Sequence, residues 1–322
     1  MLCEHGAGKH LKSGQISRWI GSHQWCRSGE MKLGLLTRNP EAWCSRHLLR
    51  AMEREGVEPV PFRFRDLKVR VSSQPEVQLG SGVDVVKELP AILVRPIGRG
   101  SLDEIIFQLD ILHRLNRLGT RIINHPSAIE KAVDKYHALT ILEEKGVPVP
   151  RTIVAEDPRL AQEAFDELSG DIVVKPIFGS RGIGITRITD REVAGRIFRT
   201  LAFHHHVLYL QEFIPHGTRD IRAFVIGDRI VAAMYRVGKS WKTNVSQGAE
   251  AIGLKPSSEV EALAVKAART IGCEVAGVDI LEGDGGLVIN EVNSQPGFRG
   301  LQSTTKVDLA RKIVDYMIDQ IR

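Results

Sequence analysis

The sequence predicts an α/β protein that is α+β in part, because its C-terminal half is rich in antiparallel hairpins. Three observations lead to this prediction. Strand-like and helix-like segments alternate from residue 31 to residue 124, which is typical of a small, mostly parallel α/β unit. A glycine-rich stretch at residues 179–184 separates two strand-like segments. A Gly/Asp turn at residues 282–286 joins two apolar, β-branched runs, the pattern of a β-hairpin.

The composition is that of an ordinary globular protein. The chain has 322 residues, 43% hydrophobic and 26% charged, enough for one large domain or two to three small ones. No apolar run reaches the length of about 18 residues that a membrane span needs, so we expect none. The cysteines contain no C-x-x-C pair, which argues against a disulfide framework or a zinc site and fits a reducing cytoplasm. They are Cys3, Cys26, Cys44 and Cys273.

The chain is mildly basic, and its first 30 residues differ from the rest. A formal net charge of +5 favours anionic ligands such as nucleotides or acidic peptides, but only weakly indicates nucleic-acid binding. Residues 1–30 are rich in Gly, Ser, His and basic residues and lack the apolar stretch of a signal peptide. A clear strand begins at Met31. We therefore expect residues 1–30 to be a disordered extension or a mis-called start.

The first unit, from residue 31 to about residue 125, alternates strands and helices. Ser101 and Glu104 have the spacing of a capping box, which opens a helix. No G-x-G-x-x-G fingerprint occurs, so we do not expect an NAD domain, and residues 68–88 are expected to be loop-like or weakly structured. The expected strands are 31–36, 57–64, 91–95 and 121–124, and the expected helices are 42–55 and 101–118.

The middle of the chain begins with a helical connection over residues 126–144. The extended Val-Pro-Val-Pro break at residues 147–150 follows, and we place a domain boundary in this region. The next expected elements are strands 151–155, 172–176, 185–189 and 209–214, and a helix within 158–168.

The glycine loop of this region could bring backbone N–H groups close to phosphate oxygens. In a Rossmann or P-loop turn a helix would follow, whereas here a strand follows, so the loop is expected to fold over phosphates as a hairpin lid. Lys175, at the end of the preceding strand, would reach an α- or β-phosphate. A plain flexible hairpin is the alternative.

Three consecutive histidines, residues 204–206, resemble a metal site only superficially. Adjacent side chains cannot all face one ion from a helix or strand, so we expect a solvated turn. Beyond them, Gly227-Asp228 joins two alternating segments as a hairpin, which would place Asp220 and Arg222 on one face. A helix to Ile271, opened by a Ser258-x-x-Glu261 cap, and a terminal helix over residues 307–321 complete the pattern.

The hairpin at residues 278–293 carries polar groups on apolar strands. Strand side chains alternate, so Glu291 and Asn293 share a face while Val292 points to the core. The facing of Asp279 depends on the strand register, which the sequence does not give. Carboxylates are costly to bury without partners, and Mg²⁺ bound to nucleotide phosphates would satisfy them. The alternative is a hairpin whose polar residues face water.

Taken together, these segments resemble the ATP-grasp superfamily, specifically its RimK-type α-L-glutamate ligases, over essentially residues 31–322. The order and spacing carry the resemblance, since an unrelated protein would have to reproduce each segment independently. The segments are Asp134-Lys135, Lys175-Pro176 with 179–184, 211–214, 219–224, 241–244, 276–280 and 290–297. The span 219–248 is most similar to the ligases that glutamylate tetrahydromethanopterin. Gln295 is a departure, because a small residue is common there.

The resemblance implies an ATP-grasp fold with three parts. Residues 31–125 would form a pre-ATP-grasp α/β domain. Residues 126–208 would form a linker helix and a lid subdomain with the glycine-rich loop, and residues 209–322 a C-terminal antiparallel-sheet subdomain with the Mg²⁺ site. ATP would lie between the lid and the C-terminal subdomain.

The resemblance also implies the roles of individual residues. Asp279, Glu291 and Asn293 would hold two Mg²⁺ ions, for which Mn²⁺ may substitute. The catalytic candidates are Arg222, Asn244 and Arg236. The residues expected to bind ATP are Lys135, Lys175, Gly179, Ser180, Gly182, Gly184, Gln211, Glu212, Phe213, Asp220, Lys242, Thr243 and Asn244. The Glu212–Phe213 backbone would meet adenine, and Asp220 would meet the ribose or neighbouring polar groups.

The implied reaction transfers the γ-phosphate of ATP to an acceptor carboxylate, and the amino group of L-glutamate then attacks the acylphosphate. Tetrahydromethanopterin is the expected acceptor; a deazaflavin coenzyme or the acidic tail of a ribosomal protein are alternatives. A different class, a basic anion- or nucleic-acid-binding protein without turnover, would leave the carboxylate hairpin unexplained. The acceptor pocket is expected near Arg38, Asn39 and Arg95. The number of glutamates added and the oligomeric state, including a homo-oligomer, stay open.

Overall fold

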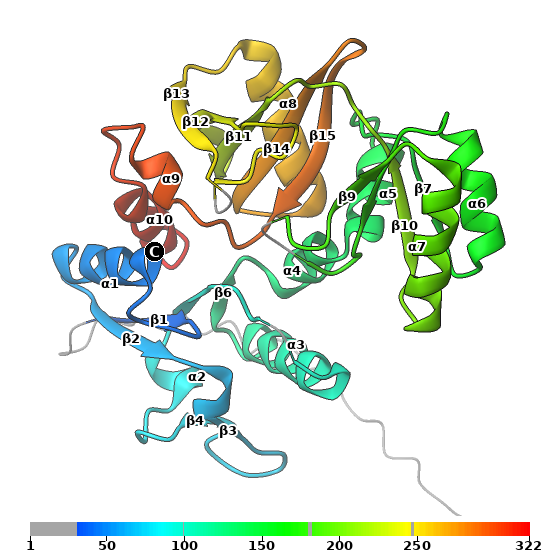
Figure 1. Ribbon diagram of the computed structural model, residues 1–322. Helices are drawn as coiled ribbons and strands as arrows, with labels where there is room; N and C mark the ends of the chain where they lie inside the picture. The colour runs from blue at the N-terminus through cyan, green and yellow to red at the C-terminus, as the bar shows by residue number, and fades with distance from the viewer. Residues whose placement is uncertain (1–30, 99, 180–181, 246–247) are drawn as a thin grey trace, which may run out of the picture.

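The computed structural model describes residues 31–98, 100–179, 182–245 and 248–322, so the expectations for residues 1–30 and for Ser180 lie outside it. Three larger sheets, each with its own helices, form the described chain (Figure 1). The α/β class is confirmed. No helix among the described residues is long and apolar enough to cross a membrane.

The elements alternate along the chain much as the pattern of apolar residues predicts. The strands are β1 Lys32–Leu36, β2 Glu58–Phe62, β3 Leu67–Val69, β4 Val77–Leu79, β5 Ala91–Val94, β6 Arg121–Ile123, β7 Thr152–Ala155, β8 Ile172–Lys175, β9 Thr186–Ile188, β10 Leu208–Glu212, β11 Arg219–Ile226, β12 Arg229–Val237, β13 Glu250–Leu254, β14 Val275–Gly283 and β15 Gly286–Asn293. The helices are α1 Trp43–Arg54, α2 Val85–Glu88, α3 Leu102–Arg117, α4 Pro126–Val133, α5 Lys135–Glu144, α6 Pro158–Glu167, α7 Arg191–Phe203, α8 Ser258–Ile271, α9 Arg299–Gln302 and α10 Leu309–Asp319, with a 3₁₀ turn η1 at Phe64–Asp66.

The N-terminal sheet is parallel throughout, in the order β2-β1-β5-β6, as the strand–helix alternation predicts. All of β5 is buried, which fits a strand covered on both faces. Polar residues directly follow two neighbouring strands: Thr37 after β1 and Arg95 after β5, both buried. The carboxyl ends of parallel strands are where open α/β sheets bind ligands.

Three expectations about local structure need correction, and two elements were not foreseen. Residues 68–88 are not loop-like: β3 and β4 pair and α2 follows, because Val77, Leu79 and Val85 are buried. The helical connection is two helices, since Asp134 is extended and its carboxylate caps α5 at the His137 N–H. The cap of α8 is Ser257, which accepts from the Val260 N–H, so the Ser258–Glu261 box is wrong. Helix α7 and strand β13 were not predicted.

The lid sheet is antiparallel, in the order β7-β10-β8-β9. Strands β8 and β9 pair on either side of the glycine loop, which confirms the predicted hairpin. Helices α6 and α7 lie together against this sheet (Figure 1) and bury Phe165 and Phe198 in its core. The three histidines that follow α7 are exposed, in a turn, as predicted.

The C-terminal sheet is antiparallel, in the order β13-β12-β11-β14-β15. One face packs on α8 through residues such as Val278, Ile280 and Ala264. The other face holds the polar residues described below. Helix α10 crosses to α1, at the N-terminal sheet (Figure 1), and Met317 and Leu48 belong to one core cluster with Phe224 of β11.

Candidate active site

The strand register places the predicted metal ligands on one face of the C-terminal sheet. Asp279 in β14 lies directly opposite Glu291 in β15, and Gly277 lies opposite Asn293. Because strand side chains alternate, the side chains of Asp279, Glu291 and Asn293 project from the same face. The facing of Asp279, which the sequence left open, is therefore shared with the other two.

A β-bulge brings one more polar residue to this face. Asp279 pairs with Glu291, but the next residue, Ile280, pairs with Ile289, so Asn290 is an extra residue in β15. A bulge of this kind locally redirects side chains. Consequently Asn290 lines the same cavity as its neighbour Glu291, although regular alternation would place them on opposite faces.

The polar face forms one wall of a large cavity. The cavity encloses about 1180 Å³, and residues of all three sheet-based parts line it. Protein pockets for small molecules usually span roughly 300–1,000 Å³, so this one has room for a nucleotide and further substrate. Thr37 and Arg95 reach it from the N-terminal sheet, Lys175 from the lid, and Asp279 from the C-terminal sheet.

Two arginines enclose Asp279. Arg222, its cross-strand neighbour in β11, donates to both carboxylate oxygens, with 2.9 Å between Nη2 and Oδ2. Arg236 in β12 lies 3.1 Å from Asp279 Oδ2 and also binds Asp220, with 2.7 Å between Nε and Oδ1. Burial opposes the charge of Arg236, but Asp279 and Asp220 more than offset it, so its pKa is raised.

Asp220 is occupied by protein partners. Besides Arg236, it accepts a 2.7 Å hydrogen bond from the hydroxyl of Thr243, and its side chain is almost fully buried. Its expected contact with the ribose or neighbouring polar groups stays a prediction. Asp220 therefore fixes Arg236 and the segment around Thr243 in place beside the cavity.

Gly277 makes room for the Arg222–Asp279 pair. A Cβ added at this position would lie 2.7 Å from Arg222 Nη1 and 2.9 Å from Pro296 Cβ. Those separations are closer than packed atoms adopt, so only glycine lets the guanidinium lie across β14.

Lys175 is the predicted phosphate contact in the lid. Its ammonium donates to Gln211 Oε1 and Asn290 Oδ1, the second at 2.8 Å, so it connects the lid to β15. Burial lowers the pKa of Lys175 to about 8, which nearby Glu291 counteracts only in part. An anion bound beside this amine would restore its charge.

Lys135 holds the glycine loop. Its ammonium donates to the carbonyl oxygens of Gly179 at 2.8 Å and Ile177 at 3.3 Å, and it lies 3.9 Å from Glu291 Oε1. The lysine at the start of α5 therefore links the loop to the carboxylate wall. Lys242 also holds this region of the lid, because it donates to the carbonyl of Ile185, just after the glycine loop, at 3.0 Å.

The segment predicted to meet adenine lies at the edge of the cavity. The backbone N–H groups of Glu212 and Phe213 donate to the carbonyls of Arg151 and Asp171, so both are committed to the lid sheet. The ring of Phe213 packs edge-on against Trp241 at 5.8 Å and beneath the guanidinium of Arg187. Those two N–H groups are therefore not free for a base, and the contact of this backbone with adenine stays a prediction.

The structure brings most of the predicted site residues to this cavity. Gly184 does not line it, although the flanking Ile183 and Ile185 do, and Ser180 lies outside the described residues. The predicted residues that line it are Lys135, Lys175, Gly179, Gly182, Gln211, Glu212, Phe213, Asp220, Arg222, Arg236, Lys242, Thr243, Asn244, Asp279, Glu291 and Asn293. The prediction gave no role to Asn290 or Trp241, although both lie in segments that carry the family resemblance. Strand alternation could not place Asn290 here, because only the bulge turns it to this face.

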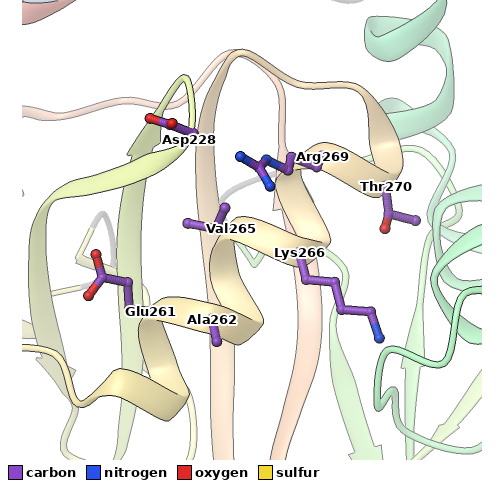
Figure 2. Close-up of a pocket in the computed structure, with 7 residues that line it drawn as sticks. All are labelled: Asp228, Glu261, Ala262, Val265, Lys266, Arg269 and Thr270. Carbon is purple, nitrogen blue, oxygen red and sulfur yellow. The ribbon is translucent and has the colours of Figure 1, made fainter.

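A second cavity, of about 400 Å³, lies over α8. In Figure 2, Lys266 extends away from Asp228 and Glu261. It donates to the carbonyl of Gly146, in the segment that follows α5, at 2.9 Å. Asp228, Glu261 and Arg269 are exposed to solvent. This cavity has no buried polar group awaiting a partner, so the larger cavity is the candidate active site.

The residues of the larger cavity fit Mg²⁺ with nucleotide phosphates. Within the described part of the chain, no three His, Cys, Asp or Glu side chains form a complete metal site. Asp279, Glu291 and Asn293 supply two carboxylates and an amide instead. Mg²⁺ is commonly bound by one or two carboxylates, with water and phosphate oxygens completing the shell. The donor set therefore suits an ion that arrives with a nucleotide.

Comparisons with known proteins agree with this geometry. Residues 132–317 match the family described as the RimK-like ATP-grasp domain. The chain is 33% identical over 319 residues to a tetrahydromethanopterin:α-L-glutamate ligase of Methanosarcina acetivorans, covering 89% of this chain and 98% of that protein. It is 32% identical to a probable α-L-glutamate ligase of Legionella pneumophila, covering 89% of this chain and 95% of that protein.

A solved structure has the same fold. It is the ATP-grasp ligase PsnB in complex with a variant of its minimal precursor, Mg and ADP, which superposes with a TM-score of 0.70 at 21% identity. The match covers 91% of this chain and 99% of that one.

Proposed function

We infer the reaction of this chain from one premise: the chain belongs to the RimK-like ATP-grasp family. It is an ATP-dependent ligase that joins a carboxylate to an amine. The specific reaction that we propose is amide formation between an acceptor carboxylate and the α-amino group of L-glutamate, with tetrahydromethanopterin as the acceptor. The similarity to ligases of that name over nearly their whole length supports this choice.

One observation carries the proposal: Asp279, Glu291 and Asn293 share one face of a cavity into which Lys135 and Lys175 also project. A triphosphate and a carboxylate repel each other, and the cationic side chains of this cavity would offset that repulsion. Bound Mg²⁺ would neutralise phosphate oxygens and stabilise the transferring phosphoryl group. Two ions, and Mn²⁺ as a substitute, are part of the proposal.

The proposed chemistry has two steps. An oxygen of the acceptor carboxylate forms a bond to the γ-phosphorus of ATP, the bond from that phosphorus to the bridging oxygen breaks, and ADP leaves. The glutamate nitrogen then bonds to the acyl carbon, the carbon–oxygen bond to the phosphate breaks, and the nitrogen loses a proton. Inorganic phosphate and an amide are the products.

The arginines and lysines of the cavity have separate tasks in this scheme. Lys135 and Lys175 would bind phosphate oxygens, and the glycine loop that Lys135 holds would cover them. Arg222 and Arg236 face the carboxylate wall and would orient the acceptor carboxylate and the phosphoryl group as charge develops. Asn244, which also lines the cavity, would donate to the same oxygens.

The experiment is ADP release from the purified protein with ATP, Mg²⁺, L-glutamate and tetrahydromethanopterin. We expect ADP formation that requires both substrates, and a product whose mass has increased by one or more glutamate residues. Absence of glutamate-dependent ADP would contradict the proposal.

Exchanging the acceptor in the same assay distinguishes the alternatives. A deazaflavin coenzyme or an acidic peptide that supports faster turnover than tetrahydromethanopterin would transfer the assignment to that acceptor. For the non-catalytic alternative, a double variant, Asp279→Asn with Glu291→Gln, would leave anion binding intact, whereas the ligase proposal expects loss of turnover. The cytoplasmic location and a homo-oligomer remain predictions from the sequence.

A further inference from the structure

Arg95 is a buried cation whose charge the described residues leave uncompensated. It follows β5 directly, its backbone N–H donates to the Leu36 carbonyl, and the residue is only 7% exposed. The guanidinium donates from Nη1 to the Pro296 carbonyl at 2.9 Å. Among the described residues no carboxylate lies within ion-pair distance of it. A guanidinium has five N–H donors, so most of its capacity is unused.

A second donor nearby also lacks a partner. The side-chain nitrogen of Gln295 is buried and forms no hydrogen bond with any described residue. Gln295 precedes Pro296, whose carbonyl Arg95 holds, and both Gln295 and Arg95 line the large cavity. Buried polar groups are almost always hydrogen-bonded in native proteins. Two unsatisfied donor groups in one cavity wall therefore indicate a ligand that accepts.

The surroundings of these donors favour an anion. Arg38 and Arg299 line the same cavity from the N-terminal unit and from α9. The carboxylates that line the cavity belong to other elements: Glu212 to β10, Asp220 to β11, Asp279 to β14 and Glu291 to β15. The wall that the N-terminal unit and residues 295–303 contribute thus carries cations and donors without a lining carboxylate.

The ring of Phe298 does not replace a counter-ion for Arg95. The guanidinium carbon lies 5.9 Å from the ring centroid, near the outer limit for a cation–π contact. Burial lowers the pKa of Arg95, as expected for a cation removed from water without an anionic partner.

We propose that Arg95 and the side-chain amide of Gln295 form a binding subsite for a substrate carboxylate in the large cavity. Arg95 binds the carboxylate with its free N–H groups, as guanidinium groups do in bidentate pairs, and Gln295 donates a further hydrogen bond. This subsite deepens the proposed function and rests on it: the carboxylate belongs either to L-glutamate or to the acceptor, and does not itself react.

The test is calorimetric binding of L-glutamate and of tetrahydromethanopterin, each to the full chain with Mg²⁺ and a non-hydrolysable ATP analogue. From the strength of charge-assisted hydrogen bonds, we expect Arg95→Met and Gln295→Met each to weaken the binding of one of the two ligands. For the arginine variant the expected loss of affinity is about 10- to 100-fold. The ligand that is weakened identifies the source of the carboxylate. Arg121→Met, which breaks a part-buried pair with Glu274 away from the cavity, is the matched control.

Stability separates a binding role from a structural one. Because Arg95 is buried without an anionic partner, Arg95→Met should leave the midpoint temperature of thermal unfolding unchanged or raise it. Gln295→Met should have the same effect. Unchanged affinity for both ligands in both variants would overturn the proposal, as would wild-type protein that binds neither ligand. Suppose that the wild type releases no glutamate-dependent ADP, but the two variants bind a ligand more weakly than the wild type does. The proposed function then fails and the subsite stands.

Discussion

At the scale of single residues, the site depends on how Asp279 is held. Its carboxylate is 4% exposed and lies between Arg222 and Arg236, so the three side chains are fixed before any ligand arrives. Fixed charges of this kind need no reorganisation during a reaction, which is the usual basis of electrostatic catalysis. The same arrangement makes the carboxylate expensive to remove.

We therefore expect Asp279→Asn to lower the free energy of unfolding by about 3 to 5 kcal/mol, because it leaves the buried Arg236 and the partly buried Arg222 without their shared anion. Chemical denaturation measures this. Asp166→Asn is the control: Asp166 pairs with Arg191 in the same bidentate manner but is 51% exposed, so the loss should stay below about 1 kcal/mol. Equal losses in the two variants would contradict this account of Asp279.

Lys175 predicts that nucleotide binding is accompanied by proton uptake. With a pKa near 8 in the nucleotide-free protein, it is about half neutral at pH 8, and a phosphate beside it would raise that pKa. Nucleotide binding should therefore take up a fraction of a proton between pH 8 and about pH 10, and almost none at pH 6.5, where Lys175 is already charged.

Calorimetry in buffers of different ionisation enthalpy measures this uptake. The Lys175→Met variant should bind nucleotide more weakly and lose the uptake at pH 8. Retention of the same uptake in that variant would assign the proton to another group.

At the scale of elements, the hairpin β14–β15 could be predicted only in part. The alternation of apolar residues located its strands and placed Glu291 and Asn293 on one face. The facing of Asp279 and the inward turn of Asn290 depend on pairing and on a bulge, which are properties of two strands together. For the same reason the sequence did not show that Asp220 would be occupied by Arg236 and Thr243.

Gly277 tests the packing of this hairpin. Gly277→Ala should displace Arg222 and lower the free energy of unfolding by about 1 to 3 kcal/mol, as overpacking usually does. Gly285→Ala in the turn of the same hairpin should be nearly neutral, because nothing lies within 4 Å of its Cβ position. Chemical denaturation of both variants measures the two changes. If Gly277→Ala left the free energy of unfolding unchanged, the close approach of Arg222 and Pro296 to this position would be refuted.

At the scale of the whole molecule, helix α10 joins the N-terminal sheet to the C-terminal sheet. Met317 of α10 and Leu33 of β1 belong to the same core cluster as Phe224 of β11. The lid has a separate core around Phe198. This cross-connection could not be predicted from the sequence, since an amphipathic terminal helix can cover any apolar surface. The domain boundaries drawn from the sequence stay predictions.

This connection predicts a pattern of hydrogen exchange. Met317→Ala should cost about 2 to 5 kcal/mol and speed exchange in both β1 and β11, while β8 in the lid keeps its protection. Phe198→Ala should instead speed exchange in β8 of the lid and leave β1 and β11 protected. Faster exchange in β1 without any change in β11 would show that the two sheets are stabilised independently.

The most direct test of the account is the position of a metal in this cavity. A crystal of the protein grown with Mn²⁺ and a non-hydrolysable ATP analogue would show the ion by its anomalous scattering. We predict the peak between the oxygens of Asp279, Glu291 and Asn293, with the triphosphate beneath the glycine loop. A peak elsewhere, or those three side chains turned away from the nucleotide, would contradict the assignment.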